Sequence, residues 1–165
     1  MWPRDNVLPI AADQQRWPLR ECSGVDSDGE ITAKLSTFLR LALEAVRLMF
    51  PNKFGRIINS GSVAAILGRP TIHAYVAAKA GLHGLTRSMA AEMGRHGITI
   101  NALAPGYFAT ELNTALMNDE AFTKWVEART PAGRWARPEE LGGAAVFLAS
   151  DAAAYINSHV LAVDG

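Results

Sequence analysis

The clearest indications of the fold lie in residues 56–103, RIINSGSVAAILGRPTIHAYVAAKAGLHGLTRSMAAEMGRHGITINAL. Its two ends, residues 56–59 and 98–103, are short apolar runs that are typical of buried parallel strands. Residues 60–73 contain Gly and Pro breakers and predict a loop, whereas residues 74–95 predict one long helix. A strand, a helix and a second strand in this order predict a parallel sheet with a helix packed on it.

The flanking segments continue the same alternation of helix and strand. Apolar residues at helical spacing predict a helix over residues 31–50. Two short helices are expected near residues 110–117 and 119–128, a longer helix at 138–149 and a last strand at 159–163. Three strands that alternate with helices place the chain in the α/β class.

Three polar side chains in the central stretch are candidates for catalysis. Tyr75 and Lys79 lie four residues apart in YVAAK, and Ser62 lies thirteen residues before Tyr75. Positions i and i+4 share one face of a helix, so the phenol and the ammonium can reach the same pocket. A neighbouring cation favours the phenolate form, which suits the pair to general acid and base catalysis. A serine hydroxyl aimed at the same point can hold a carbonyl or alcohol oxygen. For each residue alone, a structural role is the more common one.

Four stretches carry a resemblance to a known family: GRIINSGSVAA, YVAAKAGLHGLTRSMAAE, ITINALAPGYFATEL and the final VDG. Their order and spacing resemble the C-terminal part of a short-chain dehydrogenase/reductase, over residues 31–165. The resemblance implies the C-terminal part of a Rossmann-like doubly wound parallel sheet with flanking helices. Residues 105–150, from PGYFAT to VFLAS, are similar to the gluconate 5-dehydrogenase branch, which acts on sugar acids.

The resemblance implies an NAD(P)-dependent oxidoreductase that interconverts an alcohol and a ketone of a sugar acid such as gluconate. Tyr75 would exchange a proton with the substrate oxygen, and Ser62 would orient that oxygen. Lys79, together with Tyr75, would bind the nicotinamide-ribose hydroxyls. Reduction of a 3-oxoacyl thioester uses the same three residues and stays open as an alternative. The choice between NAD and NADP also stays open, because the family's selecting residues lie in the part that this chain does not resemble.

The same resemblance assigns further cofactor contacts to Asn59, Pro105, Gly106, Phe108 and Thr110. The PGYFAT segment would pass beneath the nicotinamide, with the Phe108 backbone at its carboxamide and the Thr110 hydroxyl at the amide or the pyrophosphate. From the residues alone, Pro105 and Gly106 form a turn after a strand, and Asn59 closes a strand end.

A carboxylate substrate would need a cation, and Arg binds carboxylates through two parallel hydrogen bonds. Arg69 and His73 flank Tyr75 in the sequence and are the preferred candidates, ahead of Arg134 and Arg137. Surface charge is the competing interpretation for each of them.

Two aromatic residues and the histidines have other assignments. Trp125 and Trp135 fall in the segment that forms a substrate lid in the family, and core packing is the equal alternative. The four His residues show no ligand spacing, so no catalytic metal is expected.

Two features of the family are missing from the sequence. No run resembles its Gly-rich pyrophosphate loop, since residues 1–30 contain only Gly24 and Gly29. That segment is too short for the preceding βα units and is interpreted as an irregular leader, ahead of a truncated family domain at 31–165. The run ITAKLSTFL also lacks the Asn that completes the family's proton relay. We therefore expect weak cofactor binding by this chain alone.

Bulk properties exclude several classes of partner. The chain has 16 basic and 16 acidic residues, so nucleic acid is not indicated as a partner. No apolar run reaches the ~18 residues of a membrane helix, so no membrane is expected as a partner either. Its start lacks the apolar stretch of a signal peptide, and the single Cys22 cannot form an internal disulfide. The cytoplasm is the expected location.

The family's packing helices correspond to residues 31–50 and 74–95 here, which implies a homo-oligomer, either a dimer or a tetramer. The strand at 56–59 would lack a neighbour and expose an open edge. Three interpretations stay open: an active oxidoreductase, an inactive fragment, and a non-catalytic oligomer subunit.

Overall fold

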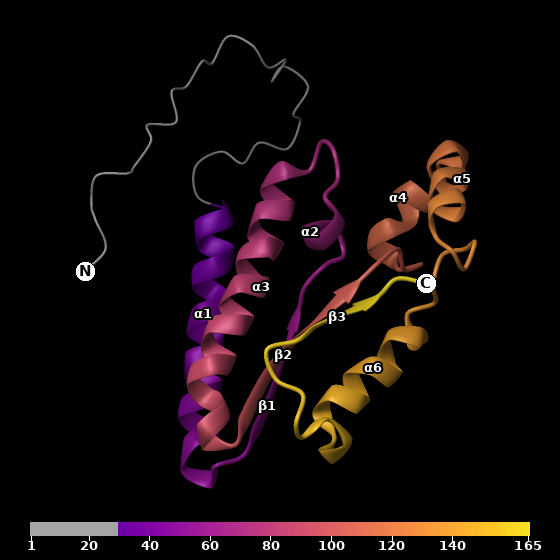
Figure 1. The fold of residues 1–165 in the computed structure, drawn as a ribbon. Coiled ribbons are helices and arrows are strands. Elements are labelled where there is room, and N and C mark those ends of the chain that lie inside the picture. Colours follow the sequence, from indigo (N-terminus) through magenta and orange to yellow (C-terminus); the bar gives the residue numbers. More distant parts are fainter. Residues whose placement is uncertain (1–29) are drawn as a thin grey trace, which may run out of the picture.

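Three parallel strands form the centre of residues 30–165, the part of the chain that the computed structural model describes (Figure 1). The strands are β1 (Gly55–Ser60), β2 (Ile98–Pro105) and β3 (Val160–Val163), hydrogen-bonded in that order. The predicted α/β class with a parallel sheet and flanking helices is confirmed. The leader predicted at residues 1–30 lies outside the described residues, except for the last one.

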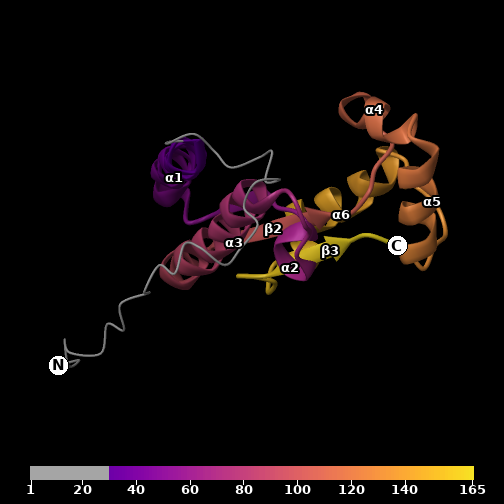
Figure 2. The same ribbon diagram turned by 90° about the horizontal axis from the view of Figure 1, so that it is seen from above.

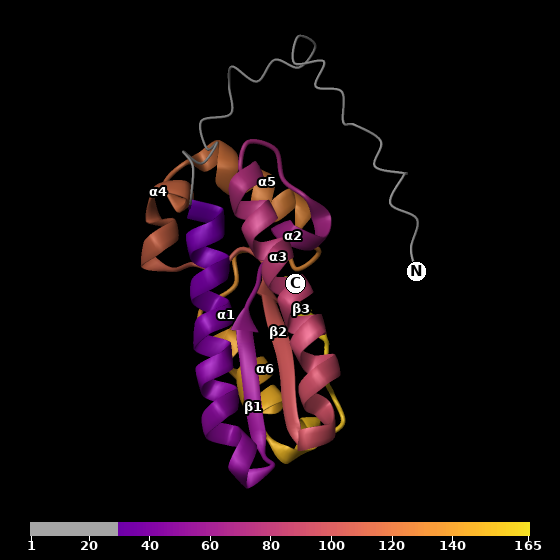
Figure 3. The same ribbon diagram turned by 90° about the vertical axis from the view of Figure 1, so that its left-hand side faces the viewer.

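Helices cover both faces of this sheet (Figures 2 and 3). α1 (Glu30–Met49) and α3 (His73–Met93) lie on one face, and α6 (Glu139–Ala149) lies on the other. Successive strand residues point to opposite faces of a sheet. Ile57 of β1 accordingly packs in the cluster with α1 and α3, whereas Ile58 packs in the cluster with α6.

The pairing of β1 with β2 brings their carboxyl ends to one edge. Gly55 lies opposite Ile98, and the register continues to Ser60 opposite Leu103. Within residues 30–165, β1 has no neighbour on its other side, as predicted for an open edge strand.

The remaining helices are short. α5 (Glu120–Arg129) has three turns, and Asp119 caps it by accepting hydrogen bonds from the Ala121 and Phe122 N–H groups at 3.0 and 3.1 Å. The other short elements are α2 (Ala64–Leu67), α4 (Thr114–Met117) and the 3₁₀ turns η2 (Phe50–Asn52), η3 (Gly94–His96), η4 (Glu111–Asn113) and η5 (Asp151–Ala153).

Two predicted segments differ from the structure in detail. The loop predicted at 60–73 contains the one-turn helix α2, because Ala64–Leu67 contains no Gly or Pro and lies between Gly61 and Gly68. The helix predicted at 110–117 is the 3₁₀ turn η4 followed by the single turn α4.

A buried amide places β3 beside β2. Asn101 is 1% exposed; its Nδ2 donates to the Ile156 carbonyl at 2.9 Å, and its Oδ1 accepts from the His159 N–H at 3.0 Å. Both partners belong to the segment that enters β3, so the position of the last strand depends on this side chain.

In the described part of the chain, no helix combines the length and apolar character needed to cross a bilayer.

The core between β2 and the helices α1 and α3 provides a test of this architecture. Ile100 is fully buried in β2, so Ile100→Ala should lower the free energy of unfolding by roughly 2–5 kcal/mol through lost apolar burial and a residual cavity. Urea denaturation followed by circular dichroism measures the loss. Leu112→Ala is the matched control, because Leu112 is 93% exposed and should leave the stability almost unchanged. Equal effects of the two changes would contradict the assigned core.

Candidate active site

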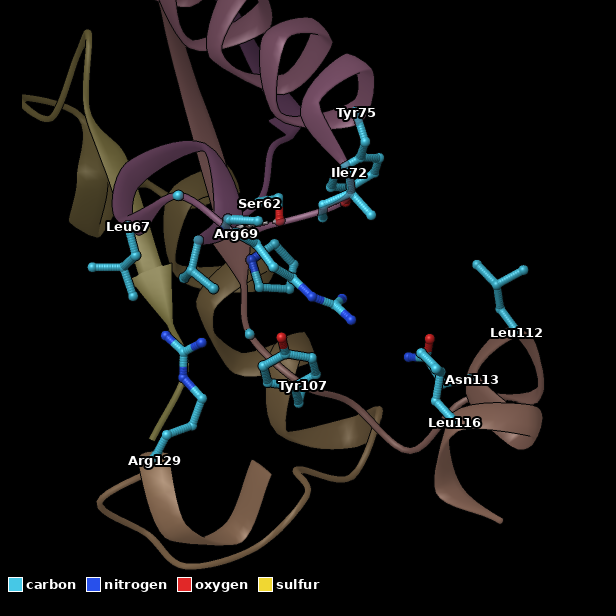
Figure 4. Close-up of a pocket in the computed structure, with 15 residues that line it drawn as sticks. Ser62, Leu67, Arg69, Ile72, Tyr75, Tyr107, Leu112, Asn113, Leu116 and Arg129 are labelled. Carbon is cyan, nitrogen blue, oxygen red and sulfur yellow. Dashed lines mark hydrogen bonds between the residues drawn. The ribbon is translucent and has the colours of Figure 1, made fainter. Parts of the chain in front are cut away.

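A pocket of about 380 Å³ opens at the carboxyl ends of β1 and β2 (Figure 4). Crevices at this end of a parallel sheet are the usual ligand sites of open α/β folds. Of the residues predicted from the sequence, five line this pocket: Ser62, Arg69, Tyr75, Pro105 and Gly106. Four others are not among its lining residues: Asn59, Lys79, Phe108 and Thr110.

The turn after β1 holds Ser62 at the pocket floor. The Gly61 N–H donates to the Leu103 carbonyl at 2.6 Å, and the Val63 N–H donates to the Pro105 carbonyl at 3.2 Å. Ser62 is only 7% exposed, and its Oγ accepts from the Ala64 N–H at 3.2 Å. The hydroxyl proton can therefore point at a ligand oxygen while the oxygen itself stays anchored.

Tyr75 and Lys79 lie one turn apart at the start of α3, as their spacing predicts. Tyr75 is 43% exposed and lines the pocket, so its phenol is accessible to a ligand. Lys79 Nζ lies 5.8 Å from the centre of the Tyr75 ring and donates to the Ser60 carbonyl at 2.6 Å. This hydrogen bond ties α3 to the end of β1 and so fixes the distance between Tyr75 and the Ser62 turn.

His83 supports the same turn from below, and the sequence reasoning missed this role. The Ser62 N–H points at His83 Nε2 at 3.4 Å, and a Cβ on Gly61 would overlap that nitrogen. Burial lowers the pKa of His83 from its ordinary 6.5, and the charges of Arg87 and Lys79 lower it further. A neutral imidazole can accept this hydrogen bond from the Ser62 N–H. The signal was present, because positions 75, 79 and 83 follow the four-residue spacing of one helix face.

The PGYFAT segment leaves the sheet at the end of β2. The Gly106 N–H donates to the Val163 carbonyl at 3.0 Å, and a Cβ on Gly106 would overlap Asp164. Phe108 is buried, and its carbonyl accepts from Asn113 Nδ2 at 2.8 Å and from the Thr110 N–H at 2.9 Å. These contacts fix the backbone of the segment beside the pocket.

Asn59 has a structural partner. Its Nδ2 donates to Thr86 Oγ1 at 2.9 Å, and that hydroxyl donates to the Leu82 carbonyl at 2.8 Å. The amide thus joins the end of β1 to the middle of α3, which agrees with the strand-end role suggested by the residue alone.

Four aromatic rings form one wall next to the pocket. Tyr107 makes edge-to-face contacts with Phe122, Trp125 and Trp135, with ring centres 5.6–5.8 Å apart. The guanidinium of Arg69 lies over the Phe122 ring at 5.0 Å. Trp125 and Trp135 therefore both pack against Phe122 and against Tyr107, and Tyr107 lines the pocket.

The other candidates for binding a carboxylate substrate lie elsewhere. Arg134 forms two hydrogen bonds with Glu140 at 2.7 and 2.8 Å, and the Arg137 N–H donates to the same carboxylate at 2.7 Å. The Arg134 hydrogen bonds, followed by that of Arg137, lower the pKa of Glu140 from 4.5 to about 2. Both arginines are thus held at the start of α6. His73 is exposed and does not line the pocket. Among the described side chains, no group of three or more His, Cys, Asp or Glu could hold a metal ion.

The chain has extensive similarity to known enzymes. A family model described as enoyl-(acyl carrier protein) reductase matches residues 7–165, which includes most of the segment interpreted as a leader. Gluconate 5-dehydrogenase of Gluconobacter oxydans (strain 621H) is 46% identical over 165 residues, which are 100% of this chain and 64% of that protein. The 3-oxoacyl-[acyl-carrier-protein] reductase of Escherichia coli (strain K12) is 42% identical over 162 residues, 98% of this chain and 61% of that protein.

A solved structure agrees with these sequence relatives. The crystal structure of a gluconate 5-dehydrogenase from Burkholderia cenocepacia J2315, in complex with NADP and tartrate, is 45% identical and superposes with a TM-score of 0.81. The superposition covers 86% of this chain and 57% of that one. The chain therefore spans less than two thirds of the length of these relatives.

The lowered pKa of His83 gives a pH-dependent signal for its contact with the Ser62 turn. The unfolded state binds the His83 proton more tightly than the folded state does. The contribution of His83 to the free energy of unfolding is therefore fully present above pH 6.5 and decreases as the pH falls below that value. His83→Gln should remove this component, because an amide does not titrate. Denaturation curves at several pH values between 8 and 5 provide the measurement. Curves that decline in parallel for the two proteins would show that His83 is not held neutral.

Proposed function

The chain belongs to the short-chain dehydrogenase/reductase family, and on that premise we propose that its pocket interconverts an alcohol and a ketone of a sugar acid such as gluconate. The observation that carries this proposal is the meeting of Ser62, Tyr75 and Arg69 in one pocket at the carboxyl ends of β1 and β2. Gluconate 5-dehydrogenase is the activity named for the relatives at 45–46% identity.

The chain's own residues supply the proton chemistry of this reaction. The Tyr75 phenol gives a proton to the carbonyl oxygen in reduction and takes one from the alcohol in oxidation. The Ser62 hydroxyl donates a hydrogen bond to the same oxygen and stabilises the charge that develops there. The Lys79 ammonium donates a hydrogen bond to the Ser60 carbonyl and so keeps the start of α3 in register with the end of β1.

The residues at this edge of the sheet fit the nicotinamide end of NAD or NADP. Tyr75 and Lys79 offer a hydroxyl and an ammonium, which suit ribose hydroxyls. Asn59 and the segment from Pro105 to Thr110 would line the same end, with Phe108 at the carboxamide and Thr110 at the amide or the pyrophosphate. Hydride exchange with the substrate carbon is the chemistry that a bound nicotinamide supplies. Within residues 30–165, Thr110 is the one residue that we propose as a contact to the pyrophosphate.

The electrostatics of the pocket favour a sugar acid over a thioester. Arg69 can bind a carboxylate through two hydrogen bonds, and within residues 30–165 no Asp or Glu lines the pocket to neutralise it. The similarity to a 3-oxoacyl-[acyl-carrier-protein] reductase keeps thioester reduction as the competing function. Turnover of acetoacetyl thioesters but not of 5-keto-gluconate would favour it.

A homo-oligomer, a dimer or a tetramer formed through α1 and α3, belongs to the same proposal. Four leucines of α1 are exposed to between 38 and 78%, which is unfavourable in a monomer: Leu39, Leu41, Leu43 and Leu48. The cytoplasm is the proposed location, since a single cysteine provides no internal disulfide.

Cofactor binding by this chain is expected to be weaker than micromolar, because the Gly-rich pyrophosphate loop of the family is absent from its sequence. Titration of the purified chain with NADPH and with NADH, followed by nicotinamide fluorescence, measures the affinity. Saturation at micromolar cofactor would contradict this expectation.

The proton-transfer role is tested by Tyr75→Phe, which removes the phenolic hydroxyl and keeps the ring. At high NADPH, the rate of 5-keto-gluconate reduction should fall by roughly 10²–10⁴-fold, the usual contribution of a general acid. Tyr155→Phe is the matched control, since Tyr155 is fully exposed and lies outside the pocket. Equal rates for the two variants would contradict the role of Tyr75. A folded wild-type chain without turnover would favour the inactive fragment or the non-catalytic subunit.

A further inference from the structure

The pocket is cationic in a chain whose formal net charge is zero. The whole sequence has 16 basic and 16 acidic residues, yet the 15 described residues that line the pocket include two arginines and no Asp or Glu. One arginine is Arg69; the other is Arg129, at the end of α5, which the sequence reasoning did not single out. Two unopposed guanidinium groups in one pocket favour an anionic ligand.

Neither guanidinium has a carboxylate partner among the described side chains. Other arginines do have one: Arg134 and Arg137 contact Glu140, and Arg56 lies 3.7 Å from Asp151. Arg69 and Arg129 instead lie over aromatic rings, at 5.0 Å from Phe122 and 4.7 Å from Trp125. A cation over an aromatic face keeps its charge and its hydrogen-bond donors for another partner.

The aromatic wall sets the places of the two cations. The Phe122 and Trp125 rings contact each other with centres 5.4 Å apart, and Tyr107 contacts both. In Figure 4, Arg69 points toward Asn113, whereas Arg129 points toward Leu67 on another side of the pocket. The pocket therefore presents two separate positions for an anion, each supported by a ring.

We propose that Arg129 is a second carboxylate-binding residue, and that the pocket takes hydroxy acids with a carboxylate at each end in preference to monocarboxylates. One carboxylate is held by Arg69 and the other by Arg129. Oxidation or reduction of such diacids rests on the proposed function, whereas their binding depends only on the two arginines.

Binding is tested with three six-carbon probes: glucarate with two carboxylates, gluconate with one, and sorbitol with none. Calorimetric titration of the full chain at fixed ionic strength, without cofactor, should give about tenfold tighter binding of glucarate than of gluconate, as expected for one added bidentate pair. Sorbitol should bind more weakly than either acid.

Arg129→Gln should abolish the preference for glucarate and leave gluconate binding unchanged. Arg129→Lys keeps the charge without the planar fork and should retain only part of the preference, which provides a second variant if the first unfolds. Arg137→Gln is the matched control, because that arginine is close in sequence and outside the pocket.

Equal affinity for glucarate and gluconate would overturn the proposal. It would also be overturned if Arg129→Gln and Arg137→Gln lowered the affinity for both acids by the same factor. Absence of detectable binding of both acids would also overturn it. These measurements involve no turnover, so a chain that binds glucarate through Arg129 but catalyses no reaction would count against the proposed oxidoreductase alone.

Discussion

Parallel pairing of β1 with β2 determines how the other elements are arranged around the sheet. Two parallel neighbours cannot be joined by a tight turn, so the chain must cross back over the sheet, and α3 makes that crossing. The residues that follow β1, the first turn of α3 and the residues that follow β2 then converge at one edge of the sheet. Lys79 fixes this convergence through its hydrogen bond to the Ser60 carbonyl, and the Gly61 N–H fixes it through the Leu103 carbonyl.

The chemistry of the site follows from that geometry. Ser62 and Tyr75 are brought to one pocket because they flank the crossing, and His83 supports the Ser62 turn because it lies two turns beyond Tyr75 on the same helix. The side of the pocket proposed to bind substrate is built by a different part of the chain. The segment after β2 provides Tyr107 and the aromatic wall, and the guanidinium groups of Arg69 and Arg129 lie over rings of that wall.

The central βαβ unit could be predicted from the sequence because its signals are local: short apolar runs, Gly and Pro breakers, and a long helix of small residues. The spacing of Tyr75 and Lys79 likewise predicted one helix face. Local signals failed where partners are distant. The partner of Asn59, Thr86, lies 27 residues away. Glu140 lies only six and three positions from Arg134 and Arg137, but the spacing alone did not show that both arginines would contact it.

Sequence patterns were enough to predict the α/β class and the order of strands and helices. Together with the family resemblance, they also identified Ser62, Tyr75 and Lys79 as the candidate catalytic set. Residue spacing carries this information, since helices and strands have fixed periods. The arginines that line the pocket together could be identified only from the three-dimensional packing. Arg69 and Arg129 lie 60 positions apart, and they meet in one cavity because the α5 segment folds back over the end of the sheet and packs Phe122 and Trp125 against Tyr107. The role of a charged side chain depends on its spatial neighbours, and the packing of the fold determines which neighbours it has.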